Sequence, residues 1–126
     1  MKPIVYDSGV LIAADKNVRR VWAEHRVRLE AGVVPMVPAP VVAQASRSPA
    51  QVQMKRLLRG CEVVHFDEAA AHEAGSLLAK TRTVDVVDAS VAALGARAGA
   101  DVVTNDADDI RRLLSAARAK SAIIDI

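Results

Sequence analysis

Short apolar runs alternate with longer amphipathic stretches along the whole chain. The short runs have the length of β-strands, whereas the longer stretches repeat their apolar residues at helical spacing. The predicted strands are residues 4–6, 33–37, 62–65, 101–104 and 122–126, and the predicted helices run from Ser8 to Ala14, Asn17 to Gly32, Pro38 past Gln44, Ser48 to Gly60, Asp67 to Lys80, Asp85 to Gly99 and Ala107 to Ala119. This order predicts an α/β fold in which helices cover both faces of a central parallel sheet.

A few polar residues and prolines set the expected boundaries of these elements. Ser8, Asn17 and Ser48 each precede an amphipathic stretch, and we expect their side chains to cap the helices that follow. Pro35 interrupts the second strand, and because proline cannot donate a hydrogen bond to a neighbouring strand, this strand is predicted to lie near a sheet edge. His25 falls on the apolar face of its helix and is expected to be an interior histidine.

Three aspartates lie where elements meet the same edge of the predicted sheet. Asp7 and Asp106 each follow a strand, and Asp88 lies in the first turn of a helix. Each residue alone has an ordinary structural explanation, as a helix cap, a turn former or a first-turn acid. Residues just past the carboxyl ends of parallel strands gather in one crevice, so the three carboxylates are predicted to converge.

Convergence of these carboxylates is unfavourable unless a positive charge offsets it. Two like charges about 4 Å apart repel by roughly 4 kcal/mol at an effective dielectric near 20. Protonation or an arginine would offset the repulsion, but a divalent cation does so best, and oxygen ligands favour Mg²⁺ or Mn²⁺. No Cys or His adjoins the three aspartates in the sequence, so zinc is not expected.

The composition predicts one domain that spans residues 1–126. The sequence is 52% hydrophobic but only 2% aromatic, so its core must consist of small aliphatic side chains. No run of about 18 apolar residues could span a membrane, and the first residues lead into a strand rather than a signal peptide. The single cysteine, Cys61, cannot form an intrachain disulfide. We therefore expect a cytoplasmic protein without a membrane partner.

The net charge of +2 conceals two halves of opposite charge. Residues 1–65 hold 10 Lys and Arg against 5 Asp and Glu (+5), and residues 66–126 hold 7 against 10 (−3). A basic half beside an acidic, metal-binding half would suit a nuclease, which must hold a polyanion near its metal. Solvated helix faces explain the same charges, so charge alone does not identify a nuclease.

Four segments give the chain a resemblance to a known family. They are VYDSGVLIA at Asp7, PAPVVAQASR around Gln44, VVDASVAALGA at Asp88 and VVTNDADDI at Asp106. In this order, over the whole length, the segments resemble a PIN-domain protein, and more narrowly the VapC ribonuclease toxins of bacterial toxin–antitoxin pairs. No single segment is specific, whereas the order and spacing of the four are fairly specific.

The resemblance implies a three-layer PIN-like fold with an acidic pocket that holds Mg²⁺ or Mn²⁺. It also implies an endoribonuclease that forms a homodimer and is inhibited by a VapB-like antitoxin, whose tail enters the groove beside the pocket. The residues that match the catalytic, metal-binding acids of the family are Asp7, Asp88 and Asp106, and those that match or accompany its supporting positions are Thr104, Asp109 and Asp85.

One residue departs from the family pattern. Where the family usually has a glutamate on the helix after the second strand, this chain has Gln44. A neutral amide could still orient a metal-bound water, but it removes one negative charge and cannot act as a base. A second metal site would therefore be weakened. Arg47 follows one helical turn later, and it could bind a phosphate, neutralise the acids or simply face solvent.

The expected mechanism is hydrolysis of an RNA phosphodiester. Water made more acidic by Mg²⁺ would attack the phosphorus, while the metal stabilises the charge that develops on the phosphoryl oxygens. With one Trp, one Tyr and one Phe, the chain lacks the aromatic residues of a stacking platform, so a structured RNA such as tRNA would be recognised by shape or by its loops. The basic residues expected to guide the RNA are Arg19, Arg20, Lys55 and Arg56.

Two alternatives come from other functional classes. In the first, Gln44 has disabled catalysis, and the protein only binds its antitoxin or RNA. In the second, the chain is a phosphoacceptor receiver domain, which also carries a magnesium-binding acid cluster. Receiver domains have paired acids after the first strand and a lysine after the last, whereas here Ser8 follows Asp7 and Lys120 precedes its strand. This second alternative fits the sequence poorly.

Overall fold

The computed structural model describes residues 2–126. Within them, five strands form one parallel sheet. The strand order is β3-β2-β1-β4-β5, and every neighbouring pair is parallel. The strands are β1 (Ile4–Tyr6), β2 (Met36–Pro38), β3 (Glu62–Val64), β4 (Asp101–Thr104) and β5 (Ile123–Asp125). The chain thus starts in the centre of the sheet and reaches both edges through parallel connections.

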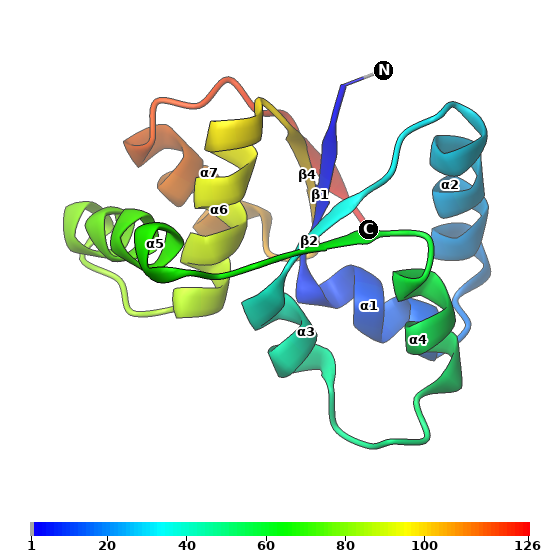
Figure 1. Ribbon diagram of the computed structural model, residues 1–126. Helices are drawn as coiled ribbons and strands as arrows, with labels where there is room; N and C mark the ends of the chain where they lie inside the picture. Colours follow the sequence, from blue (N-terminus) through cyan, green and yellow to red (C-terminus); the bar gives the residue numbers. More distant parts are fainter. Residues whose placement is uncertain (1) are drawn as a thin grey trace.

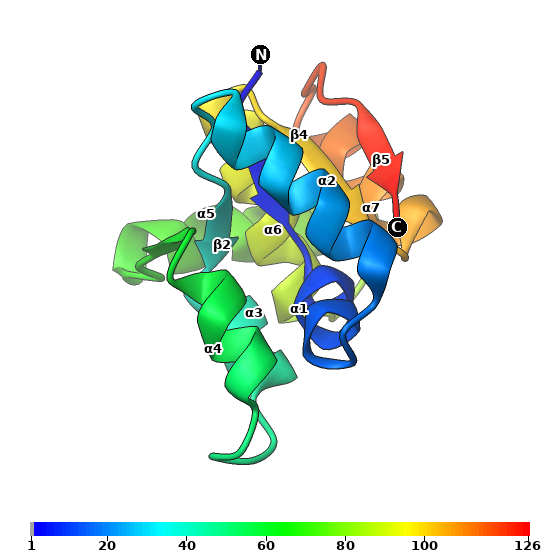
Figure 2. The same ribbon diagram turned by 90° about the vertical axis from the view of Figure 1, so that its right-hand side faces the viewer.

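Seven helices cover the two faces of this sheet. They are α1 (Ser8–Asp15), α2 (Arg19–Glu30), α3 (Ala39–Ala45), α4 (Val52–Leu58), α5 (Glu68–Thr81), α6 (Val86–Ala98) and α7 (Ala107–Ala116). Helices α5, α6 and α7 lie on one side of the sheet and α2 and α4 on the other (Figure 1). Figure 2 shows α2 crossing in front of β1 and β4. The predicted three-layer α/β fold is therefore confirmed.

The centre of the fold is the packing of α6 against the middle strands. All three residues of β1 are buried, and α6 is buried continuously from Asp88 to Gly95, unlike an amphipathic surface helix. Small residues allow this close packing: a Cβ added to Gly95 would lie 3.1 Å from Cγ2 of Val102 on β4. The position of Asp88, at the start of α6, is consequently fixed by the core.

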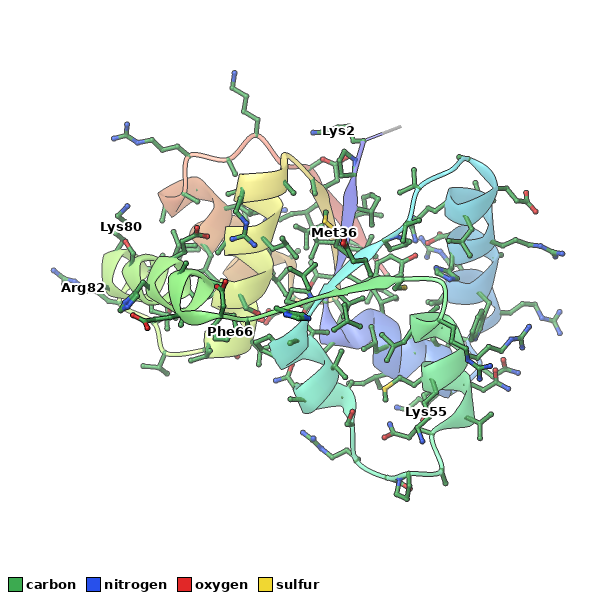
Figure 3. All side chains as sticks on the ribbon, in the orientation of Figure 1. Lys2, Met36, Lys55, Phe66, Lys80 and Arg82 are labelled. Atoms are coloured by element: carbon green, nitrogen blue, oxygen red, sulfur yellow. The ribbon has the colours of Figure 1, made fainter. Side chains whose placement is uncertain are left out.

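The charged side chains lie mainly outside this core. Figure 3 shows Lys80 and Arg82 at the outer end of α5, where their side chains point away from the sheet.

None of the helices in residues 2–126 combines the length and the apolar character needed to cross a membrane.

Three of the predicted helix caps are wrong. Asp7, not Ser8, is the N-cap of α1, and its Oδ1 accepts a hydrogen bond from the Ser8 N–H at 2.7 Å. Asn17 has a φ of 59° and lies in a turn, so α2 begins later, without a side-chain cap. Ser48 lies in a loop, because α4 starts only at Val52. In each case the polar residue lies near the start of a helix, but the N-cap is another residue, one to three positions away: Asp7, Val18 and Gln51.

The second strand lies next to an edge of the sheet, as predicted, but it is not the edge strand itself. β2 lies between β3 and β1 in the interior of the sheet. Two prolines are tolerated at the ends of this strand. Pro35 precedes the strand, and the carbonyl of Pro35 accepts a hydrogen bond from the Glu62 N–H at 2.9 Å. Pro38 ends the strand and is also the N-cap of α3, where no donor is needed. The predicted helix boundaries differ most at α4, which starts at Val52 rather than Ser48, and at α7, which ends at Ala116 rather than Ala119.

His25 is an interior histidine, as predicted. Only 4% of its surface is exposed, and its Nδ1 lies 2.8 Å from the hydroxyl of Tyr6. The same hydroxyl accepts a hydrogen bond from Nη1 of Arg28 at 3.2 Å, so it has its own proton to donate to His25. A neutral imidazole whose Nδ1 accepts this proton satisfies the arrangement. Burial, and then the charge of Arg28, lower the pKa of His25 below its usual value of 6.5.

Lowering the pH should destabilise the fold through His25. In the unfolded chain His25 gains a proton near pH 6.5, whereas the folded protein resists protonation, so stability is lost as the pH falls below 6.5. We expect the free energy of unfolding of the wild type to fall relative to that of His25→Gln between about pH 7.5 and pH 5. Urea unfolding of both proteins, with metal removed, measures this difference. If the free energies of unfolding of the two proteins change in the same way with pH, His25 is not the source of the pH dependence.

Candidate metal centre

The carboxyl edge of the sheet carries a cleft of about 570 Å³. Ligands bind at this edge in open parallel sheets, because the chain leaves each strand there and its connections form the walls. Six residues predicted to form or support the site line the cleft, namely Asp7, Gln44, Arg47, Asp85, Asp88 and Asp106. Segments far apart in the sequence therefore contribute to one acidic site.

Asp7 is the most deeply buried acid of the cleft. It is 2% exposed, and both carboxylate oxygens accept hydrogen bonds: Oδ1 from the Ser8 N–H and Oδ2 from the Thr104 hydroxyl, at 2.6 Å. Thr104 also accepts a hydrogen bond from the Asp106 N–H at 2.9 Å. The Thr104 hydroxyl thus connects the end of β1 to the turn after β4 and holds two of the predicted metal ligands in register.

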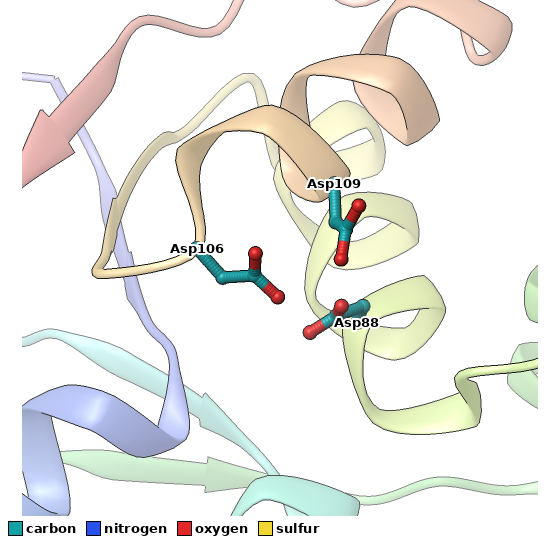
Figure 4. Close-up of side chains that lie close together, drawn as sticks. All are labelled: Asp88, Asp106 and Asp109. Atoms are coloured by element: carbon teal, nitrogen blue, oxygen red, sulfur yellow. The ribbon is translucent and has the colours of Figure 1, made fainter.

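The tightest group of acids is Asp88, Asp106 and Asp109. One oxygen atom from each carboxylate lies within 4.8 Å of the others (Figure 4). Asp106 and Asp109 approach each other because they are three residues apart at the start of α7. Asp85 lies beside them as the N-cap of α6, where its Oδ1 accepts a hydrogen bond from the Asp88 N–H at 2.9 Å. Asp109, expected only in a supporting position, therefore lies in the closest cluster, whereas Asp7 lies deeper.

The electrostatics of the cleft show an excess of negative charge. Burial, followed by the charges of Asp85, Asp7 and Asp106, raises the pKa of Asp88 from 3.8 to about 8. Burial and then the charge of Asp109 also raise the pKa of Asp106. Closely spaced carboxylate oxygens with no nitrogen or sulfur donor fit a hard divalent cation such as Mg²⁺ or Mn²⁺, which would restore the ionised form of these acids.

The four basic residues expected to guide RNA do not line this cleft. Arg19 and Arg56 line a separate hollow of about 630 Å³ between α2 and α4, where the Arg56 guanidinium lies 5.1 Å from the centre of the Trp22 ring. Arg20 forms an ion pair with Glu24 at 2.9 Å. Lys55 donates a hydrogen bond to the carbonyl of Pro49 at 2.8 Å. Any RNA that contacts all four would have to extend over α2 and α4.

Several residues that line the acidic cleft were not predicted from the sequence. Asp15 and Lys16 lie at the end of α1, and Asn105 immediately precedes Asp106. Asp15 is eight residues after Asp7, slightly more than two helical turns, so its position on the same side of α1 could have been predicted. Gln51 also lines the cleft, but it lies in the turn before α4, and no periodicity predicts its position.

Comparison with known proteins places this arrangement among related folds. The family model described as PIN domain matches residues 4–114. No curated protein matches the chain. Among solved structures, the chain is similar to VapBC2 from Rickettsia felis bound to a promoter DNA fragment (14% identity, 97% of both chains covered, TM-score 0.73). It is also similar to DNA-bound VapBC from Salmonella typhimurium (22% identity, 99% of this chain and 98% of that chain, TM-score 0.69). A third similar structure is a toxin–antitoxin complex from Klebsiella pneumoniae (14% identity, 84% and 88%, TM-score 0.65).

Removing the charge of Asp88 should stabilise the metal-free protein in alkaline solution. Its folded-state pKa is raised, so its contribution to stability is complete below pH 3.8 and is lost as the pH rises through about 8. At about pH 9 we expect Asp88→Asn to raise the free energy of unfolding by about 2 kcal/mol, because a buried unpaired charge has been removed. Urea unfolding in EDTA measures this gain.

Asp108→Asn is the matched control for this measurement. Asp108 also lies in the first turn of α7, but its side chain is 96% exposed and pairs with Arg111. Its substitution should change stability little. If the two substitutions change the free energy of unfolding equally, the destabilising charge repulsion does not lie in the cleft.

Proposed function

The chain belongs to the PIN domain family, and from this premise we propose that it is a metal-dependent endoribonuclease, the VapC-like toxin of a toxin–antitoxin pair. The observation that carries the proposal is the cluster in which Asp88, Asp106 and Asp109 bring one oxygen each within 4.8 Å of one another. Asp88 and Asp106 line the cleft together with the buried Asp7, whereas Asp109 is not among the residues that line it. A bound divalent cation promotes RNA hydrolysis by offsetting the charge of the phosphate, and this site is built from the ligands such a cation prefers.

In this proposal Asp7, Asp88 and Asp106 hold Mg²⁺ or Mn²⁺, and Asp109 supports them. A bound cation of this kind supplies acidification of water and neutralisation of charge on the phosphoryl oxygens. Thr104 fixes the carboxylate of Asp7 through its hydroxyl.

Asp85 and Gln44, which also line the cleft, act around these ligands. Asp85 caps the helix that carries Asp88, so it fixes the direction in which that helix enters the site. Gln44 offers an amide to the same cleft and can orient a water molecule or a ribose hydroxyl there.

The proposed substrate is a structured RNA such as tRNA, bound in the cytoplasm. Arg19, Arg20, Lys55 and Arg56 would then hold the RNA backbone outside the cleft. The proposed protein partners are a VapB-like antitoxin and a second copy of the chain. The similarity to structures described as VapBC and as a toxin–antitoxin complex supports the antitoxin.

Calorimetric titration with Mn²⁺ tests the metal site without knowledge of the RNA. We expect saturable binding to the wild type, and a loss of affinity of about tenfold or more in Asp88→Asn and in Asp106→Asn, because each substitution removes an anionic ligand. Asp108→Asn, whose side chain points into solvent, should bind as the wild type does. Absence of binding to the wild type at millimolar Mn²⁺ would reject the metal-dependent mechanism and favour a module that only binds antitoxin or RNA.

Restoring the glutamate at position 44 separates an active enzyme from an impaired one. If Gln44 already works as a polar, uncharged part of the site, Gln44→Glu should change the rate of tRNA cleavage by less than about tenfold. A rise of several orders of magnitude would show that the glutamine has disabled catalysis. Gel analysis of tRNA incubated with each protein and Mg²⁺ measures the rate, and Asp106→Asn serves as the inactive reference.

A further inference from the structure

We propose that Arg47 is a phosphate-binding residue of the acidic cleft and that Gln51 is the residue that positions it. The inference rests on the proposed function as a ribonuclease and specifies how the cleft accepts a phosphate despite its acids. Both residues line the cleft together with Asp7, Asp88 and Asp106. An RNA phosphate approaching these carboxylates is repelled, so a fixed positive charge on the same wall would favour its entry.

The loop that carries Arg47 is held by the side chain of Gln51. Oε1 of Gln51 accepts hydrogen bonds from the Arg47 N–H at 2.7 Å and from the Ser48 N–H at 3.0 Å. Its Nε2 donates to the carbonyl of Ala45 at 2.9 Å. One side chain therefore binds the backbone on both sides of the turn that follows α3. This loop is exposed to solvent, yet its backbone has a defined shape.

The guanidinium of Arg47 is fixed on one side and open on the other. Its Nη1 donates hydrogen bonds to the carbonyls of Ser46, at 2.8 Å, and Ala43, at 3.2 Å. Neither Nε nor Nη2 of Arg47 has a hydrogen-bond partner anywhere in residues 2–126. An arginine has five N–H donors in one plane, so an edge of this group remains available for the paired oxygens of a phosphate.

The geometry also distinguishes phosphate binding from neutralisation of the acids. No ion pair joins Arg47 to a carboxylate in the described part of the chain, although five aspartates line the same cleft. The arginine instead directs its bonds to carbonyl groups at the end of α3, which hold it without cancelling its charge. A cation kept near anions but not paired with them is available to an incoming anion.

The salt dependence of RNA binding provides a test that does not depend on turnover. The probe is fluorescent tRNA, titrated by anisotropy with Ca²⁺ in place of Mg²⁺ and shown to be intact afterwards on a gel. Each lost phosphate contact reduces the slope of log K against log salt by about 0.7 to 0.9. We expect Arg47→Ala to reduce the slope by this amount and to weaken binding about tenfold.

Two variants serve as matched comparisons for Arg47→Ala. Lys80→Ala removes the same charge from the outer end of α5 and should leave the slope unchanged (Figure 3). Arg47→Lys keeps the charge but loses the planar group, so it should keep the slope and still bind more weakly than the wild type. If Arg47→Ala and Lys80→Ala have the same slope as the wild type, the inference is wrong.

A double-mutant cycle tests the role of Gln51. Gln51→Leu removes the three hydrogen bonds to the loop and should weaken RNA binding in the wild type. In the Arg47→Ala background the same change should have almost no further effect, because Gln51 acts through Arg47. Equal losses in both backgrounds would show that Gln51 contributes only to the fold, and thermal unfolding of each variant checks its stability.

Mn²⁺ calorimetry on Arg47→Ala separates the remaining outcomes. Unchanged Mn²⁺ affinity together with a reduced RNA slope supports phosphate binding. Tighter Mn²⁺ binding with an unchanged slope means that Arg47 neutralises the acids, which overturns the inference but leaves the ribonuclease proposal intact. A wild type that binds Mn²⁺ but neither binds nor cleaves RNA would overturn the ribonuclease proposal and the inference with it.

Discussion

Repulsion between carboxylates at one edge of the sheet is the constraint to which the rest of this structure responds. The topology brings Asp7 and Asp106 together because β1 and β4 are parallel neighbours. No basic side chain within residues 2–126 forms an ion pair with these acids or with Asp88. Hydrogen bonds to Asp7 and a raised pKa of Asp88 relieve only part of the repulsion. The cleft therefore keeps an excess of negative charge that a bound cation can neutralise.

The small residues of α6 make this arrangement possible. A helix this deeply buried must approach the sheet closely, and Gly95 lies where a Cβ would press against Val102. The close approach brings the first turn of α6 to the carboxyl edge, where Asp88 meets the acids of the neighbouring strands. Stability and site geometry thus depend on the same contact, so a larger residue at position 95 would disturb both.

Much of the fold and part of the site follow from the sequence. The alternation of apolar runs and amphipathic stretches predicts the parallel sheet. The strand-end positions of Asp7 and Asp106, together with the first-turn position of Asp88, predict that the three share a cleft. Caps and strand order are less predictable, because Pro35 precedes an interior strand rather than marking an edge. Local patterns also cannot show which acids approach most closely, since the proximity of Asp109 to Asp88 depends on how α6 and α7 pack.

The position of Gln51 beside the cleft also cannot be predicted from the pattern of the sequence. Its side chain contacts a loop several residues earlier in the chain, and the contact depends on the path between α3 and α4. The role of that loop follows only from atomic contacts, whereas the acids follow from their positions at strand ends. The overall charge of the chain does not locate the cleft, because surface charges of both signs are also found far from it.

Three backbone amides donate hydrogen bonds directly into the acidic site. The N–H of Ser8 bonds to Asp7, that of Asp88 bonds to Asp85, and that of Asp106 bonds to Thr104. Amide protons are sensitive to the charge and direction of the oxygen that accepts them. The resonances of these three amides in a nitrogen-15 NMR spectrum would therefore report the ionisation and occupancy of the cleft at individual residues, without any substitution or attached probe.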